Sequence, residues 1–409
     1  MEKIMLISAD NHAGPPVRHM RDYLEQAYHD ELDAYLERKD AQRAQLRELM
    51  QNSHSKEFVE QFEATREVAW HSSARQTLLE EDGVVAEVIF PDGTQDNEVP
   101  FTGQFGEASN RYYSPELQCA GQHAYNRWAA DFCAEAKGRR AGLALVSFHD
   151  MDAAVRETEW AARTGLKGIL IPGIAYDSTR GYGAQHDVLW AACVANDLTV
   201  NIHGGAGVPP YDFGEITPAL LSIYSTEATW WSHRPLWYLM WSGVFERFPT
   251  LRVAFTEQFA DWIPRALTYM DWLWSTGPTS KAMRKLLPHA PSFYWNRQCR
   301  VGASVFSSAE CAMRRDIGTQ TVMFGTDFPH PEGSWGITAQ LLQATFPAHD
   351  VTEQEARDML GNNAARFYGF DVEALAPVVE RVGLTLTELF TPRASYDPRV
   401  TLWASRPPI

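Results

Sequence analysis

The stretch ISADNH, at residues 7–12, closes the first apolar run of this 409-residue chain. Asp10 and His12 are two residues apart, so on a β-strand their side chains point to the same face. A carboxylate and an imidazole on one face are common metal ligands. This pair becomes informative for the fold because other apolar runs of the chain end in the same way.

Three later apolar runs are each followed at once by a potential ligand, namely His203, Glu257 and Asp327. In a (β/α)8 barrel the carboxyl ends of all strands meet at one face, where such enzymes build their active sites. Four ligand-bearing run ends therefore predict an α/β fold of the (β/α)8, or TIM barrel, class with a metal site at that face.

Short apolar runs alternate with helical patterns along the chain, which favours βα units around a parallel sheet. Eight runs have the composition of strands, and eight strands close a barrel of this class. We place these strands at residues 4–9, 84–90, 141–148, 168–171, 199–202, 251–256, 299–303 and 321–325.

The connection between the first two predicted strands is much longer than an ordinary βα loop. It covers about residues 18–80 and is charged and helical in pattern, so we predict a helical insertion after strand 1 that either caps the active-site face or lies on the surface. Residues 1–375 then form one barrel domain, and residues 376–409 form a C-terminal extension. The Gly- and aromatic-rich residues 93–116 are a candidate substrate loop.

The amino-acid composition restricts the classes of binding partner and the cellular compartment that the protein can have. The net charge of −16 argues against nucleic acid and anionic membranes as partners. The five cysteines are an odd, scattered set without CxxC spacing, which is typical of reduced thiols. No signal peptide is visible, and no apolar run approaches the roughly 20 residues of a membrane span. We therefore expect a cytoplasmic protein that acts on a small molecule.

The chemistry of the candidate ligands restricts the metal. Asp10, His12, His203 and Asp327 offer two carboxylates and two imidazoles. Such mixed oxygen and nitrogen ligation suits zinc, manganese or iron and does not choose among them. A metal in an enzyme keeps an open position for water or substrate beside a few protein ligands. The sequence thus predicts at least one divalent metal ion per chain.

Three further residues are candidates for the same site. His330 follows Asp327 by three positions and either orients it or binds metal. His233 and Arg234 begin a helical run after the fifth predicted strand, where they face the pocket or serve helix capping and packing. Arg234 suits a substrate carboxylate, which a guanidinium can bind through two parallel hydrogen bonds.

The chain resembles the amidohydrolase-related branch of the amidohydrolase superfamily, which includes the aminocarboxymuconate-semialdehyde, resorcylate and 5-carboxyvanillate decarboxylases. The resemblance runs over nearly the whole chain. Its motifs are ADNH at 9–12, IHGG at 202–205, SGVFERFP at 242–249, TEQ at 256–258, GTDFPH at 325–330 and GNNAAR at 361–366. Together these motifs are specific for the branch and not for one reaction.

The resemblance implies that Asp10, His12, His203 and Asp327 are the metal ligands. The superfamily usually has His-x-His on the first strand, and the decarboxylases often have an acidic residue at the first position, as Asp10 is here. Many relatives carry a His at the end of strand 6, where this chain has Glu257. This departure weakens a direct transfer of the decarboxylase mechanism.

Some superfamily members hold two metals, bridged by a carboxylated lysine at the end of strand 4. Lys167 stands at the start of that predicted strand, so we do not expect such a bridge. Glu257, His233 and His330 could instead supply a second metal position.

The leading functional hypothesis is hydrolysis of a small carboxylate- or amide-bearing molecule. The metal would activate a water molecule, Asp327 would carry its proton to the leaving group, and Glu257 would hold the water or a second metal. His233 is a further candidate catalytic residue.

Three alternatives remain: non-oxidative decarboxylation of an aromatic or enoic acid, oxygen-dependent hydroxylation at a dinuclear iron or manganese centre, and a metal-bearing structural subunit of a heteromer. The substrate is not encoded in these motifs. We also expect a homo-oligomer, with a heteromer as the alternative, in which the residues after about Pro392 contact a neighbouring subunit.

Overall fold

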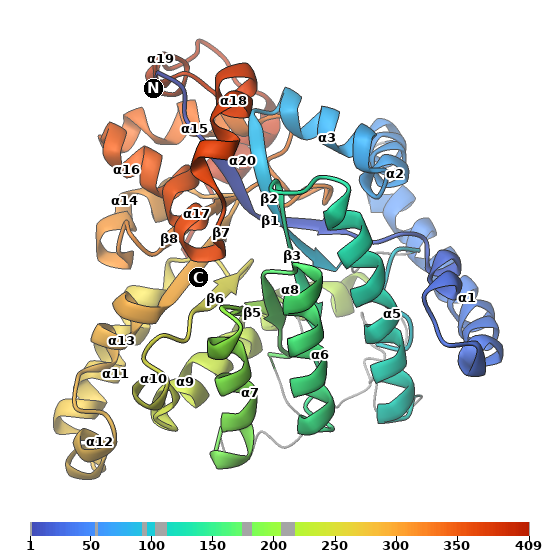
Figure 1. The fold of residues 1–409 in the computed structure, drawn as a ribbon. Coiled ribbons are helices and arrows are strands. Elements are labelled where there is room, and N and C mark those ends of the chain that lie inside the picture. The colour runs from blue at the N-terminus through green and yellow to red at the C-terminus, as the bar shows by residue number, and fades with distance from the viewer. Residues whose placement is uncertain are drawn as a thin grey trace.

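The computed structural model describes residues 2–53, 56–91, 96–102, 113–173, 182–205 and 217–408. Its eight strands are all parallel and are hydrogen-bonded in sequence order from β1 to β8 (Figure 1). The end of β1 meets the segment after β8 through two backbone hydrogen bonds, from His12 to Phe328 and from Asp327 to Asp10. The fold is therefore a (β/α)8 TIM barrel, as predicted.

Each predicted apolar run overlaps one strand, and the strands differ from the runs at their ends. They are buried almost throughout, as parallel strands between helices must be. Their bounds are β1 Leu6–Ala13, β2 Val84–Pro91, β3 Arg140–Leu145, β4 Gly168–Leu170, β5 Thr199–His203, β6 Val253–Thr256, β7 Cys299–Ser304 and β8 Val322–Gly325.

The largest difference concerns β1, which extends to Ala13 instead of ending at Ala9. After a register shift that follows Ser8, Asn11, His12 and Ala13 still pair with β2. Asp10 and His12 thus lie within the strand and not beyond it. Backbone pairing with β2 determines where β1 ends, and the local composition of the apolar run does not reveal this position.

The predicted helical insertion after β1 is present. Its elements are η1 Val17–Asp22, η2 Gln26–Tyr28, α1 His29–Ser53, α2 Lys56–Ala69 and α3 Ser72–Glu81. These helices lie beside β2 and α5 (Pro115–Ala134) in Figure 1. Leu32 and Tyr35 of α1 form a separate small core with Phe101, Tyr113 and Ala124. Of the candidate substrate loop at 93–116, only residues 96–102 and 113–116 belong to the described part of the chain.

Helices between the strands and after β8 cover the outside of the barrel. They are α6 Met151–Thr164, α7 Ala184–Ala195, α8 Pro218–Ser232, α9 Arg234–Trp241, α10 Val244–Arg247, α11 Trp262–Thr276, α12 Ser280–Leu286, α13 Pro291–Gln298, α14 Ser308–Ile317, α15 Thr338–Thr345, η4 Pro347–His349, α16 Glu353–Arg357, η5 Asp358–Asn362 and α17 Asn363–Tyr368. Within the described residues, no helix is both long and apolar enough to span a membrane.

The C-terminal segment packs against its own barrel. It contains α18 Val372–Val382, α19 Leu386–Phe390 and α20 Pro398–Ala404, so the predicted domain boundary at residue 375 falls inside α18. Leu375 and Val379 of α18 are buried with apolar residues of β1 and β2. The hydroxyl of Tyr396 donates to the carbonyl of Gln343 on α15 at 3.3 Å. Contact of this segment with a neighbouring subunit stays a prediction.

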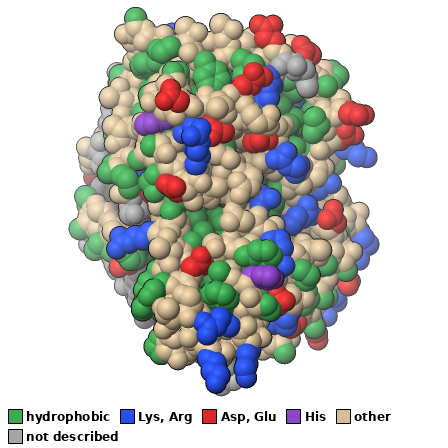
Figure 2. Space-filling view, turned by 90° about the vertical axis from the view of Figure 1, so that its left-hand side faces the viewer, with side chains coloured by type: hydrophobic (Ala, Val, Ile, Leu, Met, Phe, Trp, Pro, Cys, Tyr) green, Lys and Arg blue, Asp and Glu red, His purple; other side chains and the backbone are tan. Residues whose placement is uncertain are grey.

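One side of the molecule, which carries α11 to α14 and α16, mixes acidic, basic and hydrophobic side chains (Figure 2). In the helices α11 and α13, the large apolar residues Tyr269, Trp272 and Phe293 are exposed. Exposed rings of this kind are common at subunit contacts. They fit the predicted oligomer, which the single chain does not test.

Candidate metal centre

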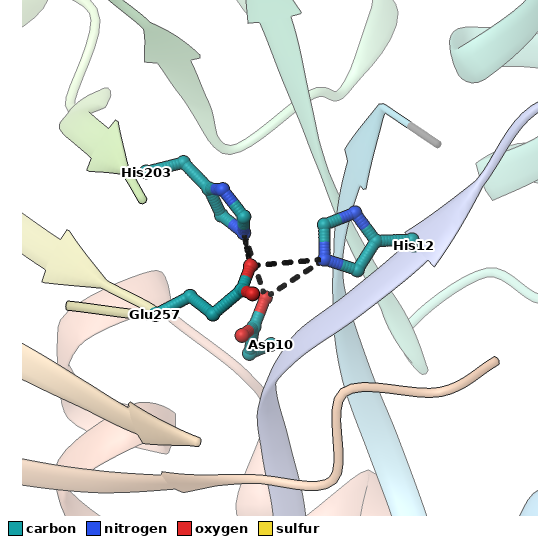
Figure 3. Close-up of side chains that lie close together, drawn as sticks. All are labelled: Asp10, His12, His203 and Glu257. Carbon is teal, nitrogen blue, oxygen red and sulfur yellow. Dashed lines mark hydrogen bonds and ion pairs between the residues drawn. The ribbon is translucent and has the colours of Figure 1, made fainter. Parts of the chain in front are cut away.

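Strands β1, β5 and β6 bring four predicted ligands together. Figure 3 shows Asp10 and His12 from β1, His203 from the end of β5 and Glu257 from just beyond β6, with their side chains pointing toward one another. One ligand atom from each lies within 4.8 Å of all the others. The prediction that these strand ends meet is therefore confirmed by the geometry.

The contacts within this first group are short. His203 Nε2 lies 2.9 Å from Glu257 Oε2 and 3.3 Å from Asp10 Oδ1. His12 Nε2 lies 3.5 Å from Asp10 Oδ1 and 3.8 Å from Glu257 Oε2. Two imidazole nitrogens and two carboxylate oxygens thus surround one point at the barrel mouth.

A second group overlaps the first and consists of His12, Glu257, Asp327 and His330. Asp327 Oδ1 lies 3.3 Å from His12 Nε2 and 3.0 Å from His330 Nδ1. The rings of His12 and His330 stack with their centroids 4.0 Å apart. The two groups share His12 and Glu257, so Glu257 has a more central place than the sequence suggested.

His12 is oriented to offer a lone pair to the cluster. Its Nδ1 lies 2.8 Å from the carbonyl oxygen of Pro91, which can only accept, so Nδ1 carries the proton. Burial, and then the neighbouring His330, lower the pKa of His12 to about 4, so the ring is neutral at pH 7. Its Nε2 is a buried atom without a hydrogen-bond partner. Buried polar atoms are rarely left unpaired, and a metal ion would satisfy this one.

The pKa values of Asp10 and Asp327 are shifted in opposite directions. Burial favours protonation of Asp10, but hydrogen bonding and charge from His203 and His12 hold the pKa of Asp10 below its ordinary value. Ser304 of β7 also donates to Asp10 Oδ2. Burial raises the pKa of Asp327, and the nearby His330 only partly opposes this rise. Without metal, Asp10 is thus the charged carboxylate, and Asp327 is the one more easily protonated.

Backbone strain marks the two ligands that follow β6 and β8. Glu257 and Asp327 have φ values of 52° and 57°. Non-glycine residues in this left-handed region cost roughly 1–3 kcal/mol and gather at functional sites. The amide of Asp327 donates to Asp10 O at 2.8 Å, and that of Glu257 donates to Gly302 O at 3.2 Å. Neighbouring strands therefore hold both residues in these conformations.

We predict that metal binding releases a proton from His203. Burial alone would lower the pKa of His203, but the carboxylates of Glu257 and Asp10 raise it well above 6.5. At pH 7 the metal must displace that proton, so affinity should rise about tenfold per pH unit until His203 deprotonates. Titration calorimetry of Mn²⁺ in two buffers of different ionisation enthalpy will detect about one proton. Heats that do not depend on the buffer would contradict this prediction.

Beneath the ligands lies a polar network that the sequence analysis missed. Asn11 Oδ1 accepts from Thr326 Oγ1 at 2.7 Å and from the amide of Phe328 at 3.1 Å, and its Nδ2 donates to Glu87 Oε2 at 2.8 Å. Arg75, from the helical insertion, donates to Glu87 Oε2 and to the carbonyl of His12, both at 2.7 Å. The sequence feature that could have indicated this network is a charged residue, Glu87, inside an otherwise apolar strand.

Of the other predicted site residues, His233 lies just outside both ligand groups. Its ring stacks on Trp262 at 3.8 Å, and its Nε2 lies 3.5 Å from the carbonyl oxygen of Gln258. Arg234 donates to Tyr238 Oη at 2.8 Å and forms no ion pair within the described residues. Lys167 directly precedes β4, at the amino end of the barrel, as expected. Direct roles for His233 and Arg234 stay predictions.

Glu332 is a second residue that sequence reasoning did not single out. Its side chain is exposed to solvent. Nearby protein atoms that limit the hydration of its carboxylate, together with the carboxylates of Asp327 and Glu257, shift the pKa of Glu332 upward, against the opposing charge of His330. The sequence feature that could have indicated Glu332 is its position in the turn that follows Asp327. Glu332 thus adds a further carboxyl group beside the cluster.

Three solved structures illustrate the fold to which the chain is similar. An amidohydrolase from Mycobacterium avium subsp. paratuberculosis shares 17% identity, with 90% of this chain and 99% of that chain covered and a TM-score of 0.62. A 5-carboxyvanillate decarboxylase from Novosphingobium aromaticivorans, complexed with manganese and 4-hydroxy-3-methoxy-5-nitrobenzoic acid, shares 17%, covering 90% and 97%, with a TM-score of 0.61. A dihydroxybenzoic acid decarboxylase from a Polaromonas species, with manganese and the inhibitor 2-nitroresorcinol, shares 16%, covering 90% and 97%, with a TM-score of 0.53.

At these identities the likeness shows a shared fold. No curated protein matches the chain significantly. The sequence profile of the amidohydrolase family matches residues 105–370, which is more than half of the chain and confirms the resemblance seen in the motifs. The chain belongs to the amidohydrolase family.

Proposed function

We propose that this enzyme is a metal-dependent decarboxylase that removes CO2, without an oxidant, from a small hydroxylated aromatic acid. One observation carries the proposal: a buried carboxyl group with a raised pKa, Asp327, lies 3.3 Å from a candidate metal ligand, His12. Decarboxylation needs such a proton donor next to the group that binds the substrate carboxylate. The two manganese-bearing decarboxylases of the same fold support this choice over hydrolysis.

The donor set fits a manganese ion. Asp10, His12, His203 and Glu257 supply oxygen and nitrogen atoms and no sulfur, which suits manganese, iron and zinc. A bound divalent ion would hold the substrate carboxylate and a neighbouring oxygen and draw electron density from them. Pro91 O and Gly204 O fix the Nδ1 atoms of His12 and His203, so that both Nε2 atoms are directed into the centre.

Asp327 would supply the proton for the chemical step. Its carboxyl group donates a proton to the ring carbon that bears the carboxylate, and the bond from that carbon to the carboxylate then breaks. The electron pair of that bond restores the aromatic ring, CO2 leaves, and water returns the proton to Asp327. His330 Nδ1, 3.0 Å from Asp327 Oδ1, orients the carboxyl group. Glu257 contacts His203 directly, so we assign it to metal binding and not to proton transfer.

The test is turnover of a panel of hydroxybenzoic acids by the manganese-loaded enzyme, followed by CO2 release and by mass spectrometry of products made in D2O. We expect CO2 and one deuterium on the carbon that lost the carboxylate. If none of these acids releases CO2 while an ester, amide or lactone is hydrolysed, the proposal is wrong. Oxygen uptake during turnover would instead support hydroxylation.

The second candidate function is hydrolysis at a dinuclear centre. The observation that favours it is the pair of overlapping ligand groups, in which His12 and Glu257 are shared. A shared carboxylate can bridge two ions, and a water between them can attack a carbonyl carbon. Elemental analysis separates the candidates, because the decarboxylase requires one manganese per chain and the dinuclear hydrolase requires two.

A further inference from the structure

The C-terminal segment inserts one arginine into a buried acidic pair. Arg406 Nη2 forms an ion pair with Glu310 Oε2 at 2.7 Å, and its Nη1 lies 3.5 Å from Asp261 Oδ2. Both carboxylate side chains are fully buried, and the side chain of Arg406 is 11% exposed. Its guanidinium also lies over the ring of Phe259, 3.7 Å from the centroid. Arg406 is therefore a built part of the barrel and not a loose terminal residue.

The acidic pair connects two parts of the barrel. Glu310 Oε1 accepts from the amide of Ala260 at 2.7 Å, and Oε2 accepts from the amide of Ser307 at 2.8 Å. Glu310 thus ties the segment after β6 to the start of α14. Asp261 lies directly before α11. Without Arg406, two carboxylates would be buried together with no guanidinium between them, which is costly.

The segment after β6, residues 257–261, has a strained backbone. Glu257 and Phe259 both have positive φ values, 52° and 58°. Such conformations persist only where the surroundings impose them. Arg406 contacts two residues near the end of this segment, Phe259 and Asp261. It also contacts Glu310, whose carboxylate accepts a hydrogen bond from the amide of Ala260. The inner end carries Glu257, which points toward His203 and Asp10 in Figure 3.

We propose that Arg406 is a positioning residue, through which the C-terminal segment holds residues 257–261 so that the Glu257 carboxylate stays in the metal centre. The proposal rests on the proposed role of Glu257 as a metal ligand. It gives the C-terminal segment a function within its own chain.

The experiment measures Mn²⁺ affinity of metal-free, full-length protein by titration calorimetry and by the Mn²⁺ electron paramagnetic resonance signal. We expect Arg406→Met to weaken Mn²⁺ binding by about tenfold, as changes behind a ligand typically do. The matched control is Arg393→Met, in the same segment and at an exposed position, which should bind Mn²⁺ like the wild type. Should Arg406→Met not fold, Arg406→Lys keeps the charge, loses the planar guanidinium, and should show a smaller loss.

A double-mutant cycle tests whether Arg406 acts through Glu257. Glu257→Ala should weaken Mn²⁺ binding, and adding Arg406→Met to it should cause no further loss. Equal losses with and without Glu257 would overturn the proposal, because Arg406 would then act on stability in general. Normal affinity in Arg406→Met, with a loss in Glu257→Ala, would overturn it but leave the metal centre intact. Normal Mn²⁺ affinity in Glu257→Ala would overturn both the role of Glu257 as a metal ligand and the role of Arg406 that rests on it.

Discussion

Replacing Asp327 with Asn should lower kcat for decarboxylation about a thousandfold, the range expected when a general acid is lost. Asn keeps the size of Asp and can still meet His330 Nδ1, which lies 3.0 Å from the carboxylate oxygen. It cannot deliver a carboxylic proton to carbon. The rate of CO2 release by the manganese-loaded variant, at saturating substrate, is the measurement.

Two comparisons make the Asp327 result specific. Asp152→Asn changes an exposed aspartate in the first turn of α6 and should leave kcat unchanged. His203→Ala should instead abolish Mn²⁺ binding, because it removes one nitrogen of the first ligand group. An Asp327→Asn variant with full metal content and at least half of the wild-type rate would exclude Asp327 as the proton donor.

The residues that gather at the candidate metal centre could be predicted from sequence for a physical reason. His203, Glu257 and Asp327 each follow a short apolar run, and in a parallel barrel the ends of such runs meet at one face. For Asp10 and His12, the two-residue period of a strand is enough to predict that their side chains lie on the same face. His330 was proposed from its place three residues after Asp327, and Glu257 was left undecided between holding water and binding metal. Its membership in both groups depends on distances that no local pattern contains.

The supporting residues could not be predicted in this way. Arg75 meets Glu87 and the backbone of His12 only because the helical insertion returns to the barrel. Arg406 and Glu310 are separated by almost a quarter of the chain, and neither lies in a distinctive motif. A proline-containing segment without a core of its own indicated an arm that reaches a neighbour. Its packing on its own barrel depends on buried carboxylates elsewhere, so the local composition gave no sign of it.

Replacing Glu87 with Gln should destabilise the barrel more than a typical surface substitution. The carboxylate is almost fully buried and accepts hydrogen bonds from Arg75, Arg140 and Asn11. Removing one partner of a buried ion pair leaves the other charge uncompensated and costs about 3–5 kcal/mol. Urea denaturation of the metal-free protein, followed by both circular dichroism and tryptophan fluorescence, measures the loss in the free energy of unfolding.

The pH dependence and a surface control distinguish this network from ordinary ion pairing. Burial favours protonated Glu87, but the charges of Arg75 and Arg140 hold the pKa of Glu87 below 4.5 in the folded protein. Its stabilisation is therefore complete above pH 4.5 and is lost as the pH falls through the lowered pKa of the folded protein, so the wild-type advantage over Glu87→Gln should shrink only below pH 4.5. Glu353→Gln breaks the pair with Arg357 on α16, in which Glu353 is 59% exposed, and should cost less than about 1 kcal/mol. Equal costs for the two variants would show that the network under Asn11 and His12 adds no more than a surface pair, and that the strands alone hold the ligands in place.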